Sequence, residues 1–321
     1  MSAGAVSNNA DGIAPSTTGN SVPHVRVLLA THNGDRWLDE QLQSIYAQRG
    51  VLASVVASDD SSTDATLDTL AKWSASQDLT TLPASGVRFG SAHRNFMRLI
   101  RDTRLDNADF FALSDQDDIW LPHKLARGIE CMKTAQADAY SSDVIAFWPE
   151  GSRHRINKSQ PQRELDYLFG SPGPGCTFVF PRATFSRLQK WVTTHFEQLR
   201  SVWVHDWLIY AFVRRHGMRW SIDDHANMLY RQHERNEIGV NAGWRAAMSR
   251  LRHVRSGAYR RDILLIADAV GEPSKVVAAM RRLTPLDRIW LVFRVRQFRR
   301  RLSECLILAA FLLLMPNDQR S

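Results

Sequence analysis

The chain has 321 residues, of which 44% are hydrophobic and 23% charged, and its net charge is +8. This apolar content supports a sizeable core and excludes global disorder, and the length fits one large domain or a domain with an extension. The charge is uneven, because residues 231–321 carry 18 Lys and Arg against 8 Asp and Glu, whereas residues 1–230 carry 23 against 25.

Residues 1–22 are rich in Ser, Asn, Gly and Ala and lack both a basic start and an apolar run. We expect a disordered leader there rather than a signal peptide. The longest apolar run, Cys305–Met315, has 11 residues and would measure about 16 Å as a helix, about half the hydrocarbon thickness of a bilayer. No transmembrane helix is therefore predicted. The three scattered cysteines show neither metal-ligand spacing nor a disulfide framework, which favours the reducing cytoplasm.

From residue 25 onward, short β-type runs alternate with helical periodicity. The predicted strands are Val25–Ala30, Leu52–Ala57, Val87–Phe89 and Phe110–Leu113. Each is followed by apolar residues at helical spacing, which begin at Leu38, Leu67, Phe96 and Leu121. This alternation predicts an α/β fold with a mainly parallel sheet flanked by helices. Such sheets bind ligands beyond the carboxyl ends of their strands, and three of these strands end in polar or acidic turns.

After residue 140 the pattern is mixed. We predict strands at Val144–Trp148, Thr177–Phe180 and Arg219–Ile222, and helices at Ala183–Phe196 and Val202–Arg215. From Trp244 the sequence is helical and rich in arginine to its end. We therefore divide the chain into a leader (1–22), an α/β domain (23–240) and a basic helical C-terminal extension (241–321).

The strongest local signal is the acidic motif Asp115-Gln116-Asp117-Asp118 at the end of a predicted strand. Three carboxylates within four residues repel one another unless a cation compensates them. A hard divalent ion such as Mg²⁺ or Mn²⁺ accepts carboxylates together with phosphate oxygens. The alternative is a solvated acidic turn that caps the next helix.

Three weaker signals each have a structural alternative. Asp60 follows the second strand and could accept from a pyrimidine imide N–H, or it could simply cap a helix. Asp206 opens an apolar helical run and could be a general base for a sugar hydroxyl, or a helix cap beside core tryptophans. The segment Tyr230–His233 could meet a diphosphate or metal, or form a basic surface cluster.

Seven segments together resemble glycosyltransferase family 2, the inverting transferases with the GT-A fold, and within it the bacterial rhamnosyltransferase-like branch. They are V-R-V-L-L-A-T-H-N-G, S-D-D-S-S-T-D, N-F-M-R-L-I, L-S-D-Q-D-D-I-W-L-P-H-K-L, G-C-T-F-V-F, V-H-D-W and Y-R-Q-H. They occur in the family's order over roughly residues 24–240, and S-D-Q-D-D-I-W is the most specific of them.

The resemblance implies a role for individual residues. Thr31, His32, Asn33 and Asp60 would hold the nucleotide, Asp115 and Asp117 would bind the metal and the diphosphate, Asp206 would be the catalytic base, and His233 would assist at the diphosphate or metal. His32 stands where the family commonly has Tyr, and Ser61 where it commonly has Gly. Both departures fall in the nucleotide-binding turns, so the identity of the base is less defined than the fold.

The resemblance also implies the reaction and its partners. We expect an inverting transfer of L-rhamnose from dTDP-L-rhamnose, with Mg²⁺ or Mn²⁺, onto a glycan or polyprenol-linked acceptor of a bacterial surface polysaccharide such as O-antigen. A UDP-hexose donor is a same-fold alternative that the sequence leaves open. Another class is a nucleic-acid-binding protein, but the basic tail contains no recognisable binding motif. A catalytically dead sugar-nucleotide binder is a third, against which the complete set of aspartates argues.

The C-terminal tail is the basis for predicting where in the cell the protein is located. Five arginines between Arg294 and Arg301 lie next to Trp290, Phe293 and Phe298, and the apolar run follows. Such a helix can lie in the headgroup region of a membrane. We therefore expect a cytoplasmic protein, peripheral on the cytoplasmic face of the inner membrane, and a chain ending near Leu286 that stays folded. The alternative is a core helix that packs on the α/β domain.

Overall fold

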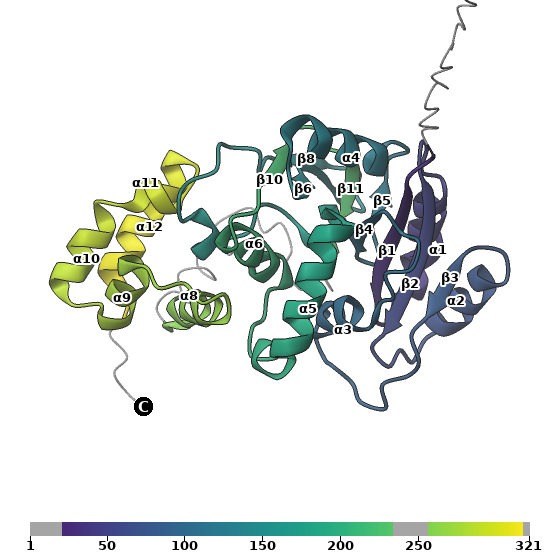
Figure 1. Cartoon of the computed structure of the whole chain (residues 1–321), viewed down its shortest axis with the longest axis horizontal. Coiled ribbons are helices and arrows are strands. Elements are labelled where there is room, and N and C mark those ends of the chain that lie inside the picture. The colour runs from purple at the N-terminus through teal and green to yellow at the C-terminus, as the bar shows by residue number, and fades with distance from the viewer. Residues whose placement is uncertain (1–20, 234–255, 317–321) are drawn as a thin grey trace, which may run out of the picture.

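The computed structural model describes residues 21–233 and 256–316 (Figure 1). Most of the predicted leader, the predicted boundary at residue 240 and the start of the predicted extension, including Trp244, lie outside the described residues. The division of the chain into three parts therefore stays a prediction at these points.

A seven-stranded sheet lies at the centre of the α/β domain, in the order β10-β6-β9-β4-β1-β2-β3. The strands are β1 (His24–Thr31), β2 (Leu52–Asp59), β3 (Leu79–Thr81), β4 (Phe110–Ser114), β6 (Ala139–Ser142), β9 (Val179–Pro181) and β10 (Trp220–Asp223). Neighbours run parallel except at β9, which is antiparallel to both β4 and β6. The predicted α/β fold with a mainly parallel sheet is confirmed.

The alternation of side chains along β1 builds a core on each face of this sheet. Leu28 and Ala30 contribute to one core, whereas Val27 and Leu29 contribute to the other. The first core includes residues of α3 (Ala92–Asp102), α5 (Arg182–Leu199) and α6 (His205–Arg215). The second includes residues of α1 (Asp35–Tyr46), α2 (Thr66–Ser74) and α4 (Lys124–Ala135). The sheet is thus covered by helices on both sides.

A smaller sheet brings distant segments to the carboxyl end of β4. Its order is β5-β11-β7-β8, and its strands are β5 (Ile119–Trp120), β11 (Met228–Arg231), β7 (Val144–Phe147) and β8 (Arg153–Ile156). Strand β5 directly follows the acidic motif, and β11 pairs with it in antiparallel register. Two short 3₁₀ helices, η1 (Asp166–Leu168) and η2 (Gly175–Thr177), precede β9.

The predicted strand at Val87–Phe89 is wrong. The third strand is Leu79–Thr81, and Val87–Phe89 lie in the loop between it and α3. The reason is visible at Phe89, whose backbone N–H donates to the carboxylate of Asp60 and is not available for strand pairing. Gly86 and Gly90, both with positive φ, bend the chain on either side.

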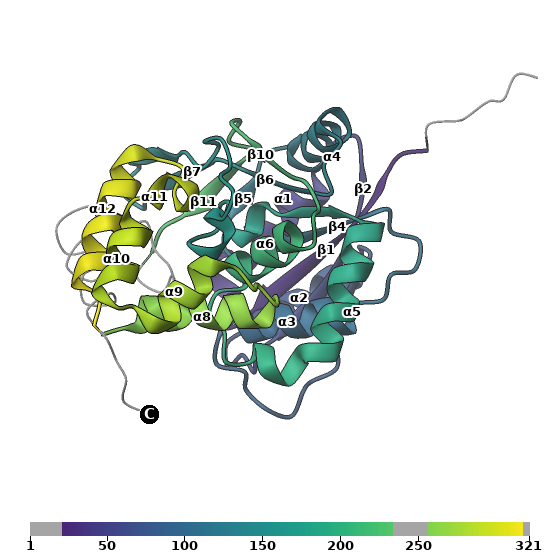
Figure 2. The same cartoon turned by 60° about the vertical axis from the view of Figure 1, so that its left-hand side comes forward.

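The C-terminal extension packs on the α/β domain beside α6, at the end of the molecule away from α1 and α2 (Figures 1 and 2). It comprises α8 (Ala258–Ala269), α9 (Lys275–Arg282), α10 (Pro285–Val292), α11 (Val295–Phe298) and α12 (Leu302–Leu314). Phe298 is fully buried and its ring stacks on Phe169 with centroids 4.4 Å apart. Leu308 and Leu312 are also buried. None of the described helices is both long and apolar enough to cross a bilayer.

This packing argues against a stable chain that ends near Leu286. Such a chain would lose Phe298 and leave the ring of Phe169 without its partner. Removing one buried aromatic side chain costs about 3–5 kcal/mol, and this truncation removes several buried residues together. One side of the extension is therefore core, as the alternative interpretation of the tail held.

Candidate active site

The carboxyl ends of three neighbouring strands bring the predicted nucleotide and acidic turns together. Thr31 at the end of β1 is paired with Asp59 at the end of β2, and Leu29 is paired with Ser114 at the end of β4. The Thr31 hydroxyl donates to Asp59 Oδ1 at 2.9 Å. Segments 31–34, 59–62 and 115–118 therefore meet at one edge of the sheet, where α/β proteins bind ligands.

Gln116 connects the first of these turns to the acidic motif. Its side-chain carbonyl accepts from the His32 backbone N–H at 2.8 Å, and its amide donates to the His32 carbonyl at 2.9 Å. A Cβ atom at Gly34 would lie 2.1 Å from Gln116 Oε1, so this approach requires glycine. The sequence analysis assigned no role to Gln116, although it lies between two of the predicted ligands.

Asp60 is buried, with 3% of its surface exposed. Its carboxylate accepts from the backbone N–H groups of Phe89 and Gly90, the latter at 2.8 Å. A carboxylate offers about four lone-pair sites, so these two bonds leave room for a ligand N–H. His32 Nδ1 lies 2.8 Å from the Asp60 carbonyl and Nε2 lies 2.9 Å from an Arg88 nitrogen, an arrangement that the Nδ1–H tautomer satisfies.

Asn33 shapes the second turn. It has a φ of 48°, its backbone N–H donates to the Ser62 hydroxyl at 2.8 Å, and its side-chain oxygen accepts from the Thr63 N–H at 2.8 Å. Asn tolerates this left-handed conformation better than most residues. The contacts of Asn33 that the structure shows hold the two turns together.

The three carboxylates of the acidic motif differ in their surroundings. Asp115 and Asp117 are half-buried, whereas Asp118 is 1% exposed. Burial, with the negative charges of Asp117 and Asp115 added to it, raises the pKa of Asp118 well above its ordinary value. Its Oδ1 accepts from the Arg231 backbone N–H at 3.1 Å. Repulsion of this kind is what a bound cation would relieve.

His233 reaches the acidic motif from the end of β11. Its Nε2 lies 2.8 Å from Asp117 Oδ2, and its ring stacks on Trp37 with centroids 4.1 Å apart. Arg231 binds the Asp117 carbonyl through its Nε at 2.7 Å. The predicted residues Asp117 and His233 are therefore in direct contact, and Trp37, which the sequence analysis did not single out, orients the imidazole.

Cys176 and Lys124 lie behind the motif and were not predicted. The Cys176 sulfur and carboxylate oxygens of Asp115 and Asp118 all lie within 4.8 Å of one another. Burial raises the pKa of the Cys176 thiol, so it is protonated and is no ligand for a hard ion. The half-buried carboxylates of Asp115 and Asp117 are oxygen donors of the kind that Mg²⁺ or Mn²⁺ takes, and the His233 imidazole lies against Asp117.

Lys124 is a buried cation at the start of α4. Its side chain is fully buried, with the ammonium 3.5 Å from the centroid of the Trp120 ring. Burial lowers the pKa of Lys124 to about 7, and the nearby Asp118 carboxylate acts in the opposite direction. Lys124 falls at helical spacing on the same face as Leu125 and Ile129. A lysine on an apolar helical face is the sequence signal by which Lys124 could have been found.

Asp206 lies in the first turn of α6, and its Oδ1 accepts from the Trp207 N–H at 2.6 Å. Burial raises the pKa of Asp206 to about 6, although the Trp207 N–H, the Ser171 hydroxyl and the positive charge of Lys158 lower it. A carboxylate with such a pKa is half-ionised near pH 6 and can accept a proton at neutral pH.

His205 connects this helix to the acidic motif. Its ring stacks on Phe96 with centroids 4.2 Å apart, and a Cβ atom at Gly175 would lie 2.2 Å from its Nε2. Gly175 is adjacent to Cys176, which lies against Asp115 and Asp118. His205, the neighbour of Asp206 in α6, therefore approaches the segment that lies against the acidic motif.

Residues 26–186 match the family model described as "Glycosyl transferase family 2". The chain is also 40% identical over 249 residues to the dTDP-rhamnosyl transferase RfbG of Shigella flexneri, an alignment that covers 77% of this chain and 86% of the relative. The chain belongs to glycosyl transferase family 2.

Solved structures of other transferases share the fold of this family 2 glycosyltransferase. One is S. aureus TarS 1–349 in complex with UDP-GlcNAc, with a TM-score of 0.56 and 15% identity over 91% of this chain and 82% of that one. Another is the mannosyltransferase PcManGT from Pyrobaculum calidifontis in complex with GDP-Man and Mn²⁺, with a TM-score of 0.51 and 17% identity over 92% and 86%. The predicted GT-A fold is confirmed.

Proposed function

We propose that this transferase moves L-rhamnose from dTDP-L-rhamnose to an acceptor hydroxyl, with inversion at the anomeric carbon and with Asp206 as the base. The observation that carries the proposal is the half-buried Asp206 carboxylate with its raised pKa, next to His205, whose ring approaches Gly175 beside the acidic motif. The choice of donor is supported by the 40% identity to a dTDP-rhamnosyl transferase.

The donor would bind at the strand ends. Thr31, His32, Asn33 and Asp60 would hold the nucleoside, because they line the turns where β1 and β2 end. Asp115 and Asp117 would hold Mg²⁺ or Mn²⁺, with His233 beside them. A divalent ion bound there would neutralise charge on the diphosphate of the donor. A structural neighbour was solved with Mn²⁺ and GDP-Man.

The proposed reaction is a single displacement in which one residue of this chain accepts a proton. Asp206 takes the proton of the acceptor hydroxyl as that oxygen attacks the anomeric carbon. The diphosphate leaves from the opposite side, so a single displacement inverts the configuration. Burial raises the pKa of Asp206 to about 6, near neutral pH, and a general base is most effective when its pKa lies near the operating pH.

Donor binding tests this proposal. Calorimetric titration of the full-length protein with dTDP-L-rhamnose, UDP-glucose and UDP-GlcNAc, each with Mn²⁺, should give the tightest binding for dTDP-L-rhamnose. Tighter binding of a UDP-hexose would move the function to the same-fold alternative.

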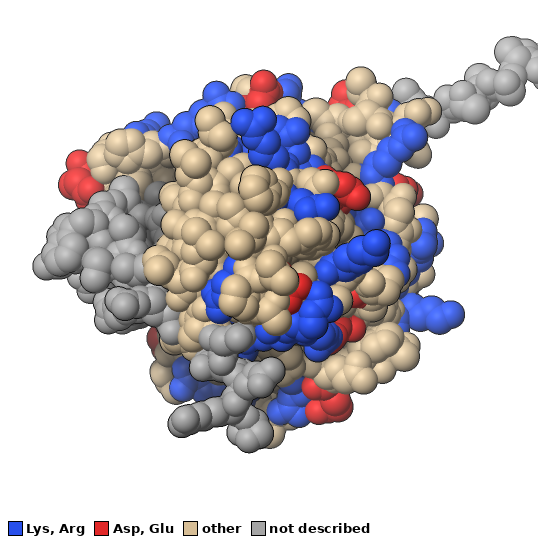
Figure 3. Space-filling model, turned by 90° about the vertical axis from the view of Figure 1, so that its left-hand side faces the viewer, with Lys and Arg blue, Asp and Glu red and all other residues tan. Residues whose placement is uncertain are grey.

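A second proposal concerns location, namely that the outer face of the extension lies on the cytoplasmic face of the inner membrane and that the acceptor is polyprenol-linked. The supporting observation is an apolar face on α10 and α12 and the Phe293 that follows α10. Its most exposed members are Leu286 (79%), Phe293 (83%), Leu306 (66%) and Leu314 (65%). Figure 3 looks onto this end of the molecule, where a broad area free of charged residues is bordered by Lys and Arg.

The structure corrects one part of the sequence interpretation of this tail. Arg300 was expected among the cations that meet lipid headgroups, but its side chain is only 9% exposed and lies against Asp166. Arg294 stacks on Trp290 with its guanidinium carbon 3.8 Å from the ring centroid. Membrane contact would therefore rest on the apolar side chains more than on the arginines.

A further inference from the structure

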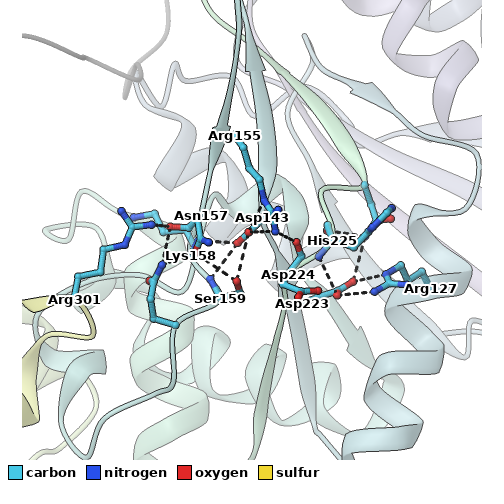
Figure 4. A network of polar contacts seen from close by, with 12 residues as sticks. Arg127, Asp143, Arg155, Asn157, Lys158, Ser159, Asp223, Asp224, His225 and Arg301 are labelled. Atoms are coloured by element: carbon cyan, nitrogen blue, oxygen red, sulfur yellow. Dashed lines mark hydrogen bonds and ion pairs between the residues drawn. The ribbon is translucent and has the colours of Figure 1, made fainter.

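Lys158 lies in a turn that the α/β domain holds firmly. Asp143 at the end of β6 is fully buried, and its Oδ1 accepts from the backbone N–H groups of Lys158 at 2.6 Å and of Ser159 at 3.1 Å. Its Oδ2 accepts from Arg155 at 2.9 Å. Figure 4 shows these bonds converging on Asp143. The turn is thus fixed in place without any contact from the Lys158 ammonium.

The C-terminal extension holds the same turn from the other side. Arg300 donates to the Lys158 carbonyl at 2.9 Å and to the Ser171 carbonyl at 2.6 Å. Arg301 donates to the Asn157 carbonyl (Figure 4). These arginines lie between α11 and α12, so the extension is attached to the α/β domain at Ser171, whose hydroxyl bonds Asp206.

The Lys158 ammonium makes no hydrogen bond or ion pair within residues 21–233 and 256–316, although the side chain is half-buried. Burial and the neighbouring charges of Arg300 and Arg299 lower the pKa of Lys158, whereas the charges of Glu304 and Asp206 raise it. The Lys158 ammonium thus lies near two arginines that pair with Glu304 and Asp166, and its own unused donors are free to bind an anionic ligand.

We propose that the Lys158 ammonium binds a phosphate of the acceptor and so places the acceptor beside Asp206. This inference rests on the proposed function, because it names the acceptor of that same site as a lipid diphosphate. The donor diphosphate would bind at Asp115 and Asp117, whereas the Lys158 turn is joined through Arg300 to Ser171, whose hydroxyl bonds the base. Lys is a common phosphate ligand, and its three donors can each meet a phosphate oxygen.

The apolar face of the extension is the reason for proposing that the acceptor carries a lipid. Leu302 is adjacent in sequence to Arg301, is 63% exposed and begins α12. A diphosphate at Lys158 would therefore sit where the cationic segment ends and the apolar face of α12 begins. A prenyl chain attached to it could run along that face, which matches the chemistry of a polyprenyl diphosphate at a membrane surface.

The test is calorimetric binding of farnesyl diphosphate and of inorganic pyrophosphate to the full-length protein, in excess chelator so that no metal recruits them. Lys158→Met should weaken binding of farnesyl diphosphate by about tenfold or more, the scale of one charge-assisted hydrogen bond. Lys158→Arg should restore most of it. Asp117→Ala and the exposed control Lys72→Met on α2 should leave it unchanged.

Three outcomes would overturn the inference. One is the absence of binding to the wild-type protein. Another is binding that Asp117→Ala abolishes and Lys158→Met leaves intact, which would assign the anion to the donor site. Equal affinities for pyrophosphate and farnesyl diphosphate would overturn the assignment to a lipid. Binding of dTDP-L-rhamnose is measured with Mn²⁺ and without chelator on the same protein preparations, so failure of the proposed function is seen separately, as absence of donor binding.

Discussion

His233 Nε2 lies 2.8 Å from Asp117 Oδ2. This contact joins the end of β11 to the acidic motif, and it makes one unit of two residues that the sequence places 116 positions apart. If the unit holds a divalent ion, each residue should matter for metal-dependent donor binding and neither should be needed for folding.

We therefore predict that Asp117→Ala abolishes transfer and weakens nucleotide binding in Mn²⁺, while its binding in chelator stays at the low wild-type level. His233→Ala should act in the same direction. The melting temperature should be maintained, because both side chains are at the edge of the core. Titrations with and without Mn²⁺ measure the effect, and undiminished wild-type turnover in excess chelator would contradict it.

Asp206→Asn should separate binding from chemistry. If Asp206 is the base, the amide cannot accept the proton, and kcat should fall by about 10²–10⁴-fold, the usual scale of general-base assistance. The Kd of the donor should remain unchanged, since the nucleotide is held by other residues. Steady-state kinetics together with donor titration measure both quantities. A weakened donor Kd with an unchanged kcat would make Asp206 a donor contact instead.

The raised pKa of Asp206 predicts a pH dependence. The base works when ionised, so kcat should be level above its pKa of about 6 and should fall about tenfold per pH unit well below it. Lys158→Met removes a cation that lowers this pKa, so the acid limb should move to higher pH. A limb that does not move would show that Lys158 has no electrostatic effect on the base.

The raised pKa of Asp206 also predicts how the stability of the fold depends on pH. Folding raises the pKa of Asp206 above its unfolded value. The contribution of Asp206 to the stability of the fold is therefore present at low pH and lost as the pH rises through about 6. Thermal melts should thus show Asp206→Asn gaining stability relative to the wild type between pH 5 and pH 8. A relative loss over that range would mean that the ionised carboxylate stabilises the fold.

The apolar face of the extension predicts binding to anionic liposomes. A variant in which Leu286, Phe293, Leu306 and Leu314 are all changed to Ser should stay folded and lose at least about tenfold in liposome affinity, since burying one large apolar side chain contributes about 1.5–3 kcal/mol. The matched control is Leu52→Ser with Val87→Ser, two residues that are 61% and 62% exposed elsewhere. Cosedimentation with liposomes measures the affinity of both variants. Equal losses of affinity in the two variants would show that the membrane contact lies elsewhere.

The sequence predicted the elements that depend on local pattern. The first, second and fourth predicted strands and the turns after them lie where the alternation placed them, because a buried strand that ends in a polar turn is a local signal. The strand at Val87–Phe89 failed because a tertiary contact, the Phe89 N–H to Asp60, decided the conformation of that segment.

The parts of the site that escaped prediction depend on contacts between distant segments. Arg300 binds the carbonyl of Lys158, 142 residues away, and no local pattern connects them. The arginines of the tail were interpreted as a membrane-facing cluster for the same reason, because a charge run shows which residues are basic and not what they face. Gln116 lies inside the acidic motif, but its contact with His32 could not be predicted, because that contact depends on the order of the strands in the sheet.

The most direct test of this account is the rate at which the nucleoside diphosphate is released from dTDP-L-rhamnose and from UDP-glucose, with Mn²⁺ and a bacterial lipid extract as the source of acceptor. We predict turnover of dTDP-L-rhamnose that requires the extract and falls by about 10²–10⁴-fold in Asp206→Asn, with UDP-glucose consumed at least about tenfold more slowly. Preferential turnover of UDP-glucose, or Asp206→Asn as active as the wild type, would contradict it.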